Sequence, residues 1–175
     1  MIVVRILSAL IGVLILVIGV YLIGMRFADG PTALAAGGPL VTGELVAEEP
    51  DWSFARDVAE IELQLMTPPR SRTVWVAEHE GVLYVPCGYM NSWWGRLWKQ
   101  WPAEAREDPR AVVRIEGKRY ERTLIPVTAA DPAAGPVLAE LGRKYGFPAP
   151  PPEMALSSEA MLLFRLAPRT QATAG

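Results

Sequence analysis

Residues 73–85 have the sequence TVWVAEHEGVLYV, in which two β-rich runs flank a short glycine-containing segment. Threonine, valine, tryptophan and tyrosine favour strands, and glycine supplies the positive φ that a tight hairpin turn needs. The pattern therefore predicts a hairpin of strands 73–78 and 82–85, joined by His79-Glu80-Gly81.

The same pattern continues on both sides of this hairpin. Residues 60–65, EIELQL, alternate strictly between polar and apolar, as in a half-buried strand, and Val41, Gly43 and Leu45 alternate in the same way. A second hairpin is predicted for residues 111–115 and 119–127 around Glu116-Gly117-Lys118, and a late strand for 160–166. Several short strands with tight turns predict a mainly β protein whose sheet closes into a barrel.

Helices are expected in two places. Asp131-Pro132 is a good helix start, Arg143 and Lys144 suit a last turn, and Gly146 suits the cap that ends it. The other helix is predicted for residues 93–107, with a break at Pro102.

Residues 6–25 form an uncharged apolar run of twenty residues between Arg5 and Arg26. About 20 helical residues cross the roughly 30 Å hydrocarbon core of a bilayer, so this run predicts a transmembrane anchor. The alternative is a cleaved signal peptide, whose apolar region is usually ~7–15 residues; 33–36, ALAA, would serve as its cleavage site. The small charge bias around the run places the following domain outside the cytoplasm of a bacterial-type cell.

The resulting organisation has four parts. Residues 1–28 are the anchor, 29–39 a flexible Gly-, Ala- and Pro-containing linker, 40–169 the barrel domain and 170–175 a disordered tail. The chain has a net charge of −2, so nucleic acid is not expected as a partner. With one histidine and one cysteine, no transition-metal site and no internal disulfide are expected.

Residues 93–101 contain four of the six tryptophans, and they suggest three uses of the predicted helix. One apolar face, with i, i+3, i+4 and i+7 spacing, is formed by Trp94, Leu97, Trp98 and Trp101. That face could pack on the barrel, lie at a membrane surface, or wall a cofactor ring. In the third case Arg96 or Lys99, on another side of the helix, would hold the phosphate of the cofactor.

Four segments in order resemble a known family: 73–76 TVWV, 81–85 GVLYV, 99–101 KQW and 108–112 DPRAV. Together they are similar to the FMN- and deazaflavin-binding split β-barrels of the pyridoxamine-phosphate-oxidase-like, nitroreductase-related superfamily. The resemblance implies a six- or seven-stranded split barrel with two or three short helices. It also implies a homodimer with its cofactor sites at the subunit interface.

The resemblance further implies which residues meet an FMN or deazaflavin. Lys99 matches the lysine that contacts the phosphate, Cys87 stands near the usual hydroxyl residue, and Ser92 is a second candidate for it. Arg96 lies three residues from Lys99, and Trp75 would line the ring pocket. Cysteine is a poor phosphate donor, and Glu104 stands where an uncharged polar residue is commoner.

No catalytic side chain is evident in this pattern. The expected function is a membrane-anchored oxidoreductase that passes electrons from its cofactor to a small acceptor such as a quinone. The alternative is a cofactor-free binding or assembly module tethered to the membrane, whose tryptophan-rich face contacts a partner or lipid.

Overall fold

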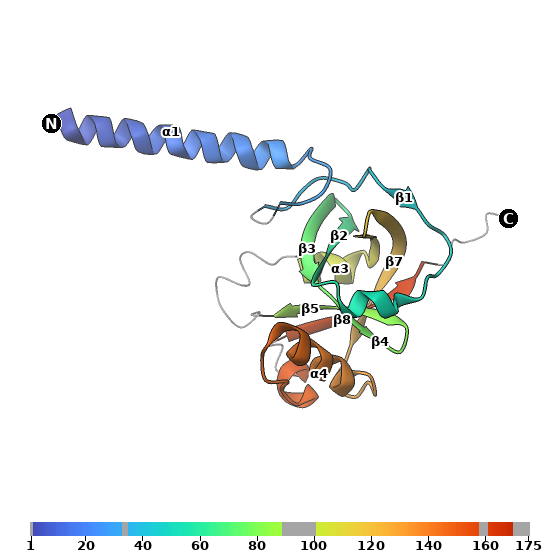
Figure 1. The fold of residues 1–175 in the computed structure, drawn as a ribbon. Helices are drawn as coiled ribbons and strands as arrows, with labels where there is room; N and C mark the ends of the chain where they lie inside the picture. The colour runs from blue at the N-terminus through green and yellow to red at the C-terminus, as the bar shows by residue number, and fades with distance from the viewer. Residues whose placement is uncertain (1, 33–34, 89–100, 158–160, 170–175) are drawn as a thin grey trace.

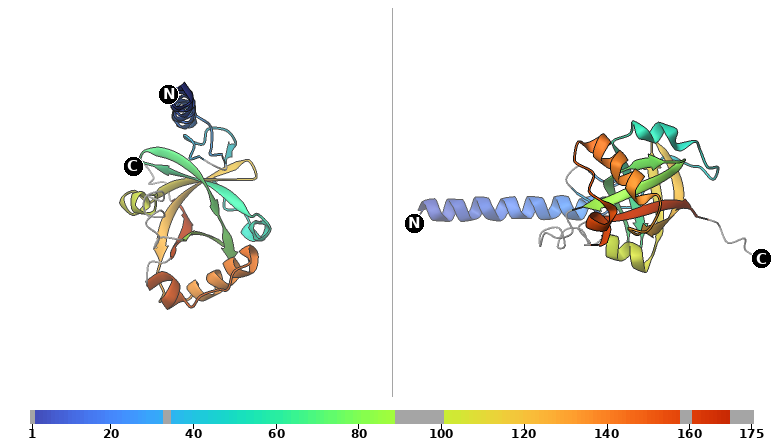
Figure 2. Two further views of the ribbon diagram at one scale, coloured as in Figure 1. Left: turned by 90° about the vertical axis from the view of Figure 1, so that its left-hand side faces the viewer. Right: turned by 90° about the horizontal axis from the view of Figure 1, so that it is seen from below.

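The structure, a computed structural model, describes residues 2–32, 35–88, 101–157 and 161–169. Helix α1, Ile2–Met25, projects away from the barrel as a separate rod (Figures 1 and 2). Almost all of its side chains are exposed, and its length and apolar composition are sufficient to cross a membrane. Its last residue, Met25, matches the end predicted from the sequence.

The rest of the described chain is built on one curved sheet, ordered β3-β2-β6-β7-β8-β5-β4, with β1 pairing β7. All pairs are antiparallel except β1 with β7. The strands are β1 Glu44–Leu45, β2 Glu60–Met66, β3 Pro69–Trp75, β4 Ala77–His79, β5 Val82–Gly88, β6 Arg110–Ile115, β7 Lys118–Val127 and β8 Met161–Pro168.

This architecture confirms the mainly β fold, a split barrel with short helices. The described strands number eight, against the six or seven expected, but β1 and β4 have only two and three residues. The path returns on itself, since β3 at one edge also contacts β5 near the other.

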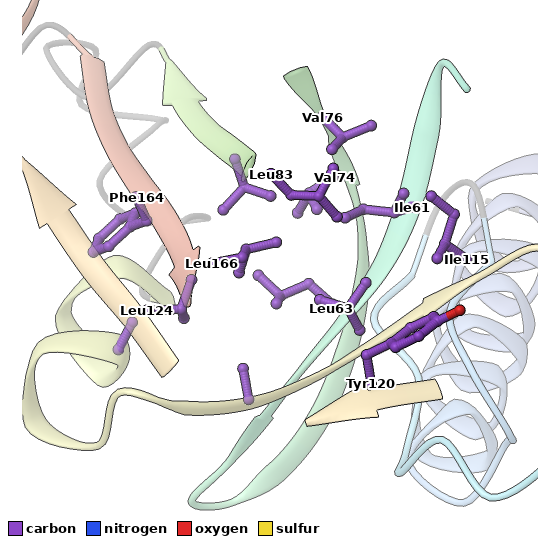
Figure 3. Close-up of a cluster of buried hydrophobic side chains, with 14 of the residues drawn as sticks. Ile61, Leu63, Val74, Val76, Leu83, Ile115, Tyr120, Leu124, Phe164 and Leu166 are labelled. Carbon is purple, nitrogen blue, oxygen red and sulfur yellow. The ribbon is translucent and has the colours of Figure 1, made fainter. Parts of the chain in front are cut away.

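The main core fills the barrel with inward-pointing side chains from β2, β3, β5, β6, β7 and β8 (Figure 3). Alternation along β2 buries Ile61, Leu63 and Leu65, as the sequence predicted. A second, smaller core lies between the barrel and helix α4, Ala134–Tyr145, where Val137, Leu138 and Leu141 are fully buried. Two apolar layers therefore hold the sheet from inside and from one flank.

The two predicted hairpins are present at their expected turns. Glu80 and Gly81 both have positive φ between β4 and β5, as do Glu116 and Gly117 between β6 and β7. Two consecutive positive φ angles match the twist of a two-residue hairpin, and glycine takes the second position in both.

The predicted strand 73–78 is divided in two at Val76. The Val76 N–H donates to the Tyr145 hydroxyl (2.9 Å), and the Val76 carbonyl accepts from Lys144 Nζ (2.9 Å). These groups of Val76 bond to the end of α4, so β3 pairs with β2 on one side of the break and β4 pairs with β5 on the other. Tertiary contact with a helix about seventy residues away thus overrides a local strand pattern.

The first helix prediction needs a correction at its N-terminal side, and only the C-terminal part of the second lies within the described residues. Helix α4 begins at Ala134, three residues after Asp131, whose side chain closes a turn by accepting from the Ala133 N–H (2.9 Å). Its end is as predicted, with Gly146 in the left-handed conformation (φ 73°). Helix α3, Trp101–Glu107, contains Pro102 in its first turn, where no N–H is needed. The rest of the predicted helix, 93–100, lies outside the described residues.

Residues 41–45 are a strand only at Glu44–Leu45, because Gly43 turns the chain with a φ of 95°. The preceding segment, expected to be a flexible tether, is hydrogen-bonded to the barrel. Gly37 forms an antiparallel bridge with Ser71 of β3, and the Leu40 N–H donates to the buried Gln64 side chain (2.6 Å). Residues 170–175, predicted as a tail, lie outside the described residues.

Candidate functional site

The five predicted cofactor residues fall into two groups. Ser92, Arg96 and Lys99 lie outside the described residues, as do three of the tryptophans near them. Trp75 and Cys87 are described. Cys87 is the penultimate residue of β5, just before that segment, and α3 begins at Trp101, just after it.

Trp75, the last residue of β3, lies on the outer face of the barrel. Its ring stacks on Tyr145 at the end of α4, with centroids 4.3 Å apart and planes 7° from parallel. Phe147 lies nearby at 6.4 Å. Trp75 remains 39 % exposed, so α4 covers only part of its ring. A stacked, half-exposed indole of this kind can support a second planar ring.

Cys87 lies inside the barrel, on the other side of the sheet from Trp75. It is 2 % exposed and belongs to the main core with Val74 and Val85. Successive side chains on a strand point to opposite faces, so Trp75 points away from the core that its neighbour Val74 enters. The structure therefore does not bring Trp75 and Cys87 together in one pocket.

Arg72 lies close to Cys87 and was not among the residues predicted from the sequence. Arg72 is on β3 two residues before Val74, and its side chain is 19 % exposed. Its guanidinium lies over the Trp101 ring, 5.8 Å from the centroid, and Nη2 is 3.4 Å from Glu104 Oε2. Helix α3 thus covers a strand arginine with an aromatic ring and a carboxylate.

The hydrogen bonding of Arg72 is incomplete. Within the described chain its Nε is buried and has no hydrogen-bond partner, and the contact with Glu104 is long. Burial lowers the Arg72 pKa from its ordinary value, while Glu104 and Cys87 oppose that shift. Because an unpaired buried donor is unfavourable, an additional acceptor at this place would be bound favourably.

This arrangement fits the anionic end of a cofactor. A guanidinium carries five donors and binds phosphate in a forked geometry, whereas the Cys87 thiol donates weakly. Glu104, which the sequence marked as a charge near the proposed phosphate, is indeed beside the cation and would compete with an anion for Arg72. The period of a strand places Arg72 on the same face as Val74, but nothing in the sequence near Arg72 indicates that Trp101 and Glu104 lie over it.

Comparison with solved structures aligned this chain with several proteins at low sequence identity. The conserved hypothetical protein Rv2991 from Mycobacterium tuberculosis aligns with 67 % of this chain and 77 % of its own, at 16 % identity and a TM-score of 0.48. HutZ, a heme storage protein from Vibrio cholerae, aligns with 67 % of this chain and 87 % of its own, at 14 % identity and a TM-score of 0.47. An F420 reductase aligns with 70 % of this chain and 96 % of its own, at 13 % identity and a TM-score of 0.44.

The chain is a split β-barrel. No family model matches the sequence, and no curated protein matches it.

Proposed function

We propose that the protein is a membrane-anchored oxidoreductase of the split-barrel type that binds a flavin or deazaflavin and reduces or oxidises a small acceptor. The observation that carries the proposal is Arg72, a largely buried cation whose Nε has no partner among the described residues. It lies beside the strand end that leads to Ser92, Arg96 and Lys99. A bound flavin or deazaflavin would supply the electron or hydride transfer. The side chains of this chain would bind and orient it.

Each candidate residue has a separate task in this proposal. Arg72 holds the phosphate from the barrel side, while Lys99 and Arg96 hold it from the segment before α3. Trp75 lies on the face of β3 opposite to Arg72 and Val74, so within one subunit it does not support the ring of a cofactor whose phosphate Arg72 holds. The Cys87 side chain is buried in the main core, so we do not propose it as a ligand.

The anchor belongs to the same proposal. Helix α1 holds the barrel at a membrane, where an acceptor dissolved in lipid, such as a quinone, is concentrated. The family resemblance adds a homodimer with the cofactor at its interface, which the half-exposed stack of Trp75 and Tyr145 would help to form.

The test is a ligand titration of the full chain purified in detergent. Fluorescence quenching of FMN, of deazaflavin F420 and of riboflavin, which lacks the phosphate, measures the three affinities. Wild type is expected to bind one phosphate-bearing cofactor, and Lys99→Ala to bind it about ten- to a hundredfold more weakly, since each 1.4 kcal/mol is a factor of ten. Equal affinity for riboflavin would reject the phosphate site.

The second candidate is the cofactor-free binding module. It is favoured by the Arg72–Glu104 contact, since a carboxylate beside the cation partly replaces an external anion. Under this alternative the purified protein is colourless, binds none of the three flavins and retains no ligand by mass spectrometry. Heme is included in the titration, and binding of heme alone would also contradict the flavin proposal.

A further inference from the structure

Backbone hydrogen bonds join the chain that follows helix α1 to the first half of β3. The Gly38 N–H donates to the Ala28 carbonyl (3.0 Å), and Gly37 and Ser71 exchange bonds of 2.9 and 3.2 Å. The Ser71 hydroxyl donates to the Gly38 carbonyl (2.6 Å). The chain just beyond the anchor is therefore fixed against the strand that carries Arg70.

The described parts of residues 26–41, here called the collar, leave little space for movement. A Cβ on Gly37 would overlap the Gly30 carbonyl, and one on Gly38 would overlap the Arg26 carbonyl. Asp29 accepts from Arg114 of β6 (2.9 and 3.0 Å) and from the Val41 N–H (2.8 Å). Such close backbone approach allows only glycine at those two positions, so the collar is tightly packed where it meets the barrel.

Two cations meet at this junction. Arg26 follows α1 directly, and Arg70 precedes Ser71, which is bonded to the collar. Neither arginine forms an ion pair within the described chain. Burial, followed by the positive charge of Arg26, lowers the Arg70 pKa, and Glu104 opposes the shift only in part. An external anion would relieve this repulsion.

The position of Arg26 along the helix suggests which anion. The 24 residues of α1 exceed the roughly 20 that cross a hydrocarbon core, so a residue just after the helix lies among the lipid headgroups. Phe27, which follows it, is 83 % exposed, so its apolar ring is free to enter the edge of a bilayer. Lipid phosphates would therefore be within reach of Arg26.

We propose that Arg26 and Arg70 together bind the phosphate of an anionic phospholipid headgroup, and that the collar holds the β3 edge of the barrel on the membrane surface. Each guanidinium can offer two parallel N–H donors to phosphate oxygens. One arginine comes from the anchor and the other from the barrel, so the site exists only while the collar holds both. The proposal rests on the membrane anchoring proposed above and does not depend on a cofactor.

The test is native mass spectrometry of the full chain in detergent micelles, titrated with phosphatidylglycerol or phosphatidylcholine of the same acyl chains. Wild type is expected to prefer phosphatidylglycerol. Arg26→Gln and Arg70→Gln are each expected to reduce that preference about five- to tenfold, from roughly 1 kcal/mol per cation near a lipid surface. Arg110→Gln is the matched control, because Arg110 is an exposed arginine paired with Asp108.

Each contrary result has a separate meaning. A membrane-extracted protein with equal affinity for both lipids, or with its preference intact in both variants, overturns the lipid site and leaves the anchor in place. Competition by millimolar inorganic phosphate as effective as that by the lipid would identify a free phosphate site and overturn the lipid assignment. A soluble protein whose intact mass lacks α1 would reject both the anchor and the lipid site.

Discussion

Arg114 and Arg72 are both barrel arginines with largely buried side chains, but their surroundings differ. Arg114 donates to both oxygens of Asp29 (2.9 and 3.0 Å), to the Thr42 hydroxyl (2.9 Å) and to Glu62, which also accepts from Nη2 at 3.1 Å. Arg72 has one long contact with Glu104 and an unpartnered Nε within the described chain. The guanidinium donors of Arg114 are therefore satisfied within the fold. Those of Arg72 are satisfied only in part by the described residues, which leaves donors for a ligand.

The charge balance of the two regions differs in the same way. Arg114 lies between two carboxylates, and its pKa is raised, chiefly by the hydrogen bond with Glu62. Burial lowers the pKa of Arg72, because one half-exposed carboxylate does not compensate for lost water. Stability is thus expected to depend on Arg114, and ligand affinity on Arg72.

The largest expected effect is the loss of Arg114. Arg114→Met leaves Asp29 and Glu62 without their shared cation and should lower the free energy of unfolding by about 3 kcal/mol. Urea unfolding of the full chain in detergent, followed by tryptophan fluorescence, measures it. Arg110→Met is the control and should change stability by less than about 1 kcal/mol, because the Arg110–Asp108 pair is exposed. Equal losses in both variants would contradict the structural role of Arg114.

Arg72→Met should behave in the opposite way. Replacing an incompletely bonded cation by an apolar chain of similar length should change stability by about 1 kcal/mol or less. Affinity for the phosphate-bearing cofactor should fall about ten- to a hundredfold. The same titration and unfolding measurements serve both arginines. A stability loss as large as that of Arg114→Met, with unchanged cofactor affinity, would make Arg72 a structural residue.

A smaller effect is expected from the carboxylate that faces Arg72. Glu104→Gln keeps the size of the side chain but removes the charge that competes with a phosphate. Cofactor affinity should rise about three- to tenfold, because the removed charge is 32 % exposed and partly screened. Glu107→Gln, on the same helix, is the control. Weaker binding in Glu104→Gln would indicate that the carboxylate orients Arg72 for the ligand.

The sequence was sufficient wherever the deciding contacts are local. The turns at Gly81 and Gly117 need only a glycine at the right place, and the Gly146 cap needs only the preceding helix. The alternation of polar and apolar residues in 60–65 likewise predicts one strand and its buried face. Such features depend on a few neighbouring residues, and so the hairpins, the alternating burial of β2 and the long apolar helix α1 could all be predicted.

The errors and omissions come from contacts between distant residues. The strand break at Val76 needs Tyr145, and the fixed linker needs Asp29 to meet Arg114, 85 residues away. Arg72 became a candidate only when α3 placed Trp101 and Glu104 over it. Local propensity carries no information on such pairings. Ser92, Arg96 and Lys99, which lie outside the described residues, stay predictions.

The smallest expected effect concerns the pH dependence of the collar. Burial raises the pKa of Asp29, but hydrogen bonds from Thr42, Val41 and Arg114 outweigh it and bring the pKa from 3.8 to about 2. A carboxyl group with a depressed pKa in the folded state stabilises the fold above its unfolded pKa. That contribution is lost as the pH falls from about 4 towards 2, since protonation removes the acceptor that Arg114 needs.

Urea unfolding at pH 5 and pH 3 should therefore show a smaller decrease in the free energy of unfolding for Asp29→Asn than for wild type. Asp57→Asn, a change at another exposed carboxylate, is the control and should follow wild type. An identical decrease in all three proteins would show that Asp29 does not secure the collar against the barrel.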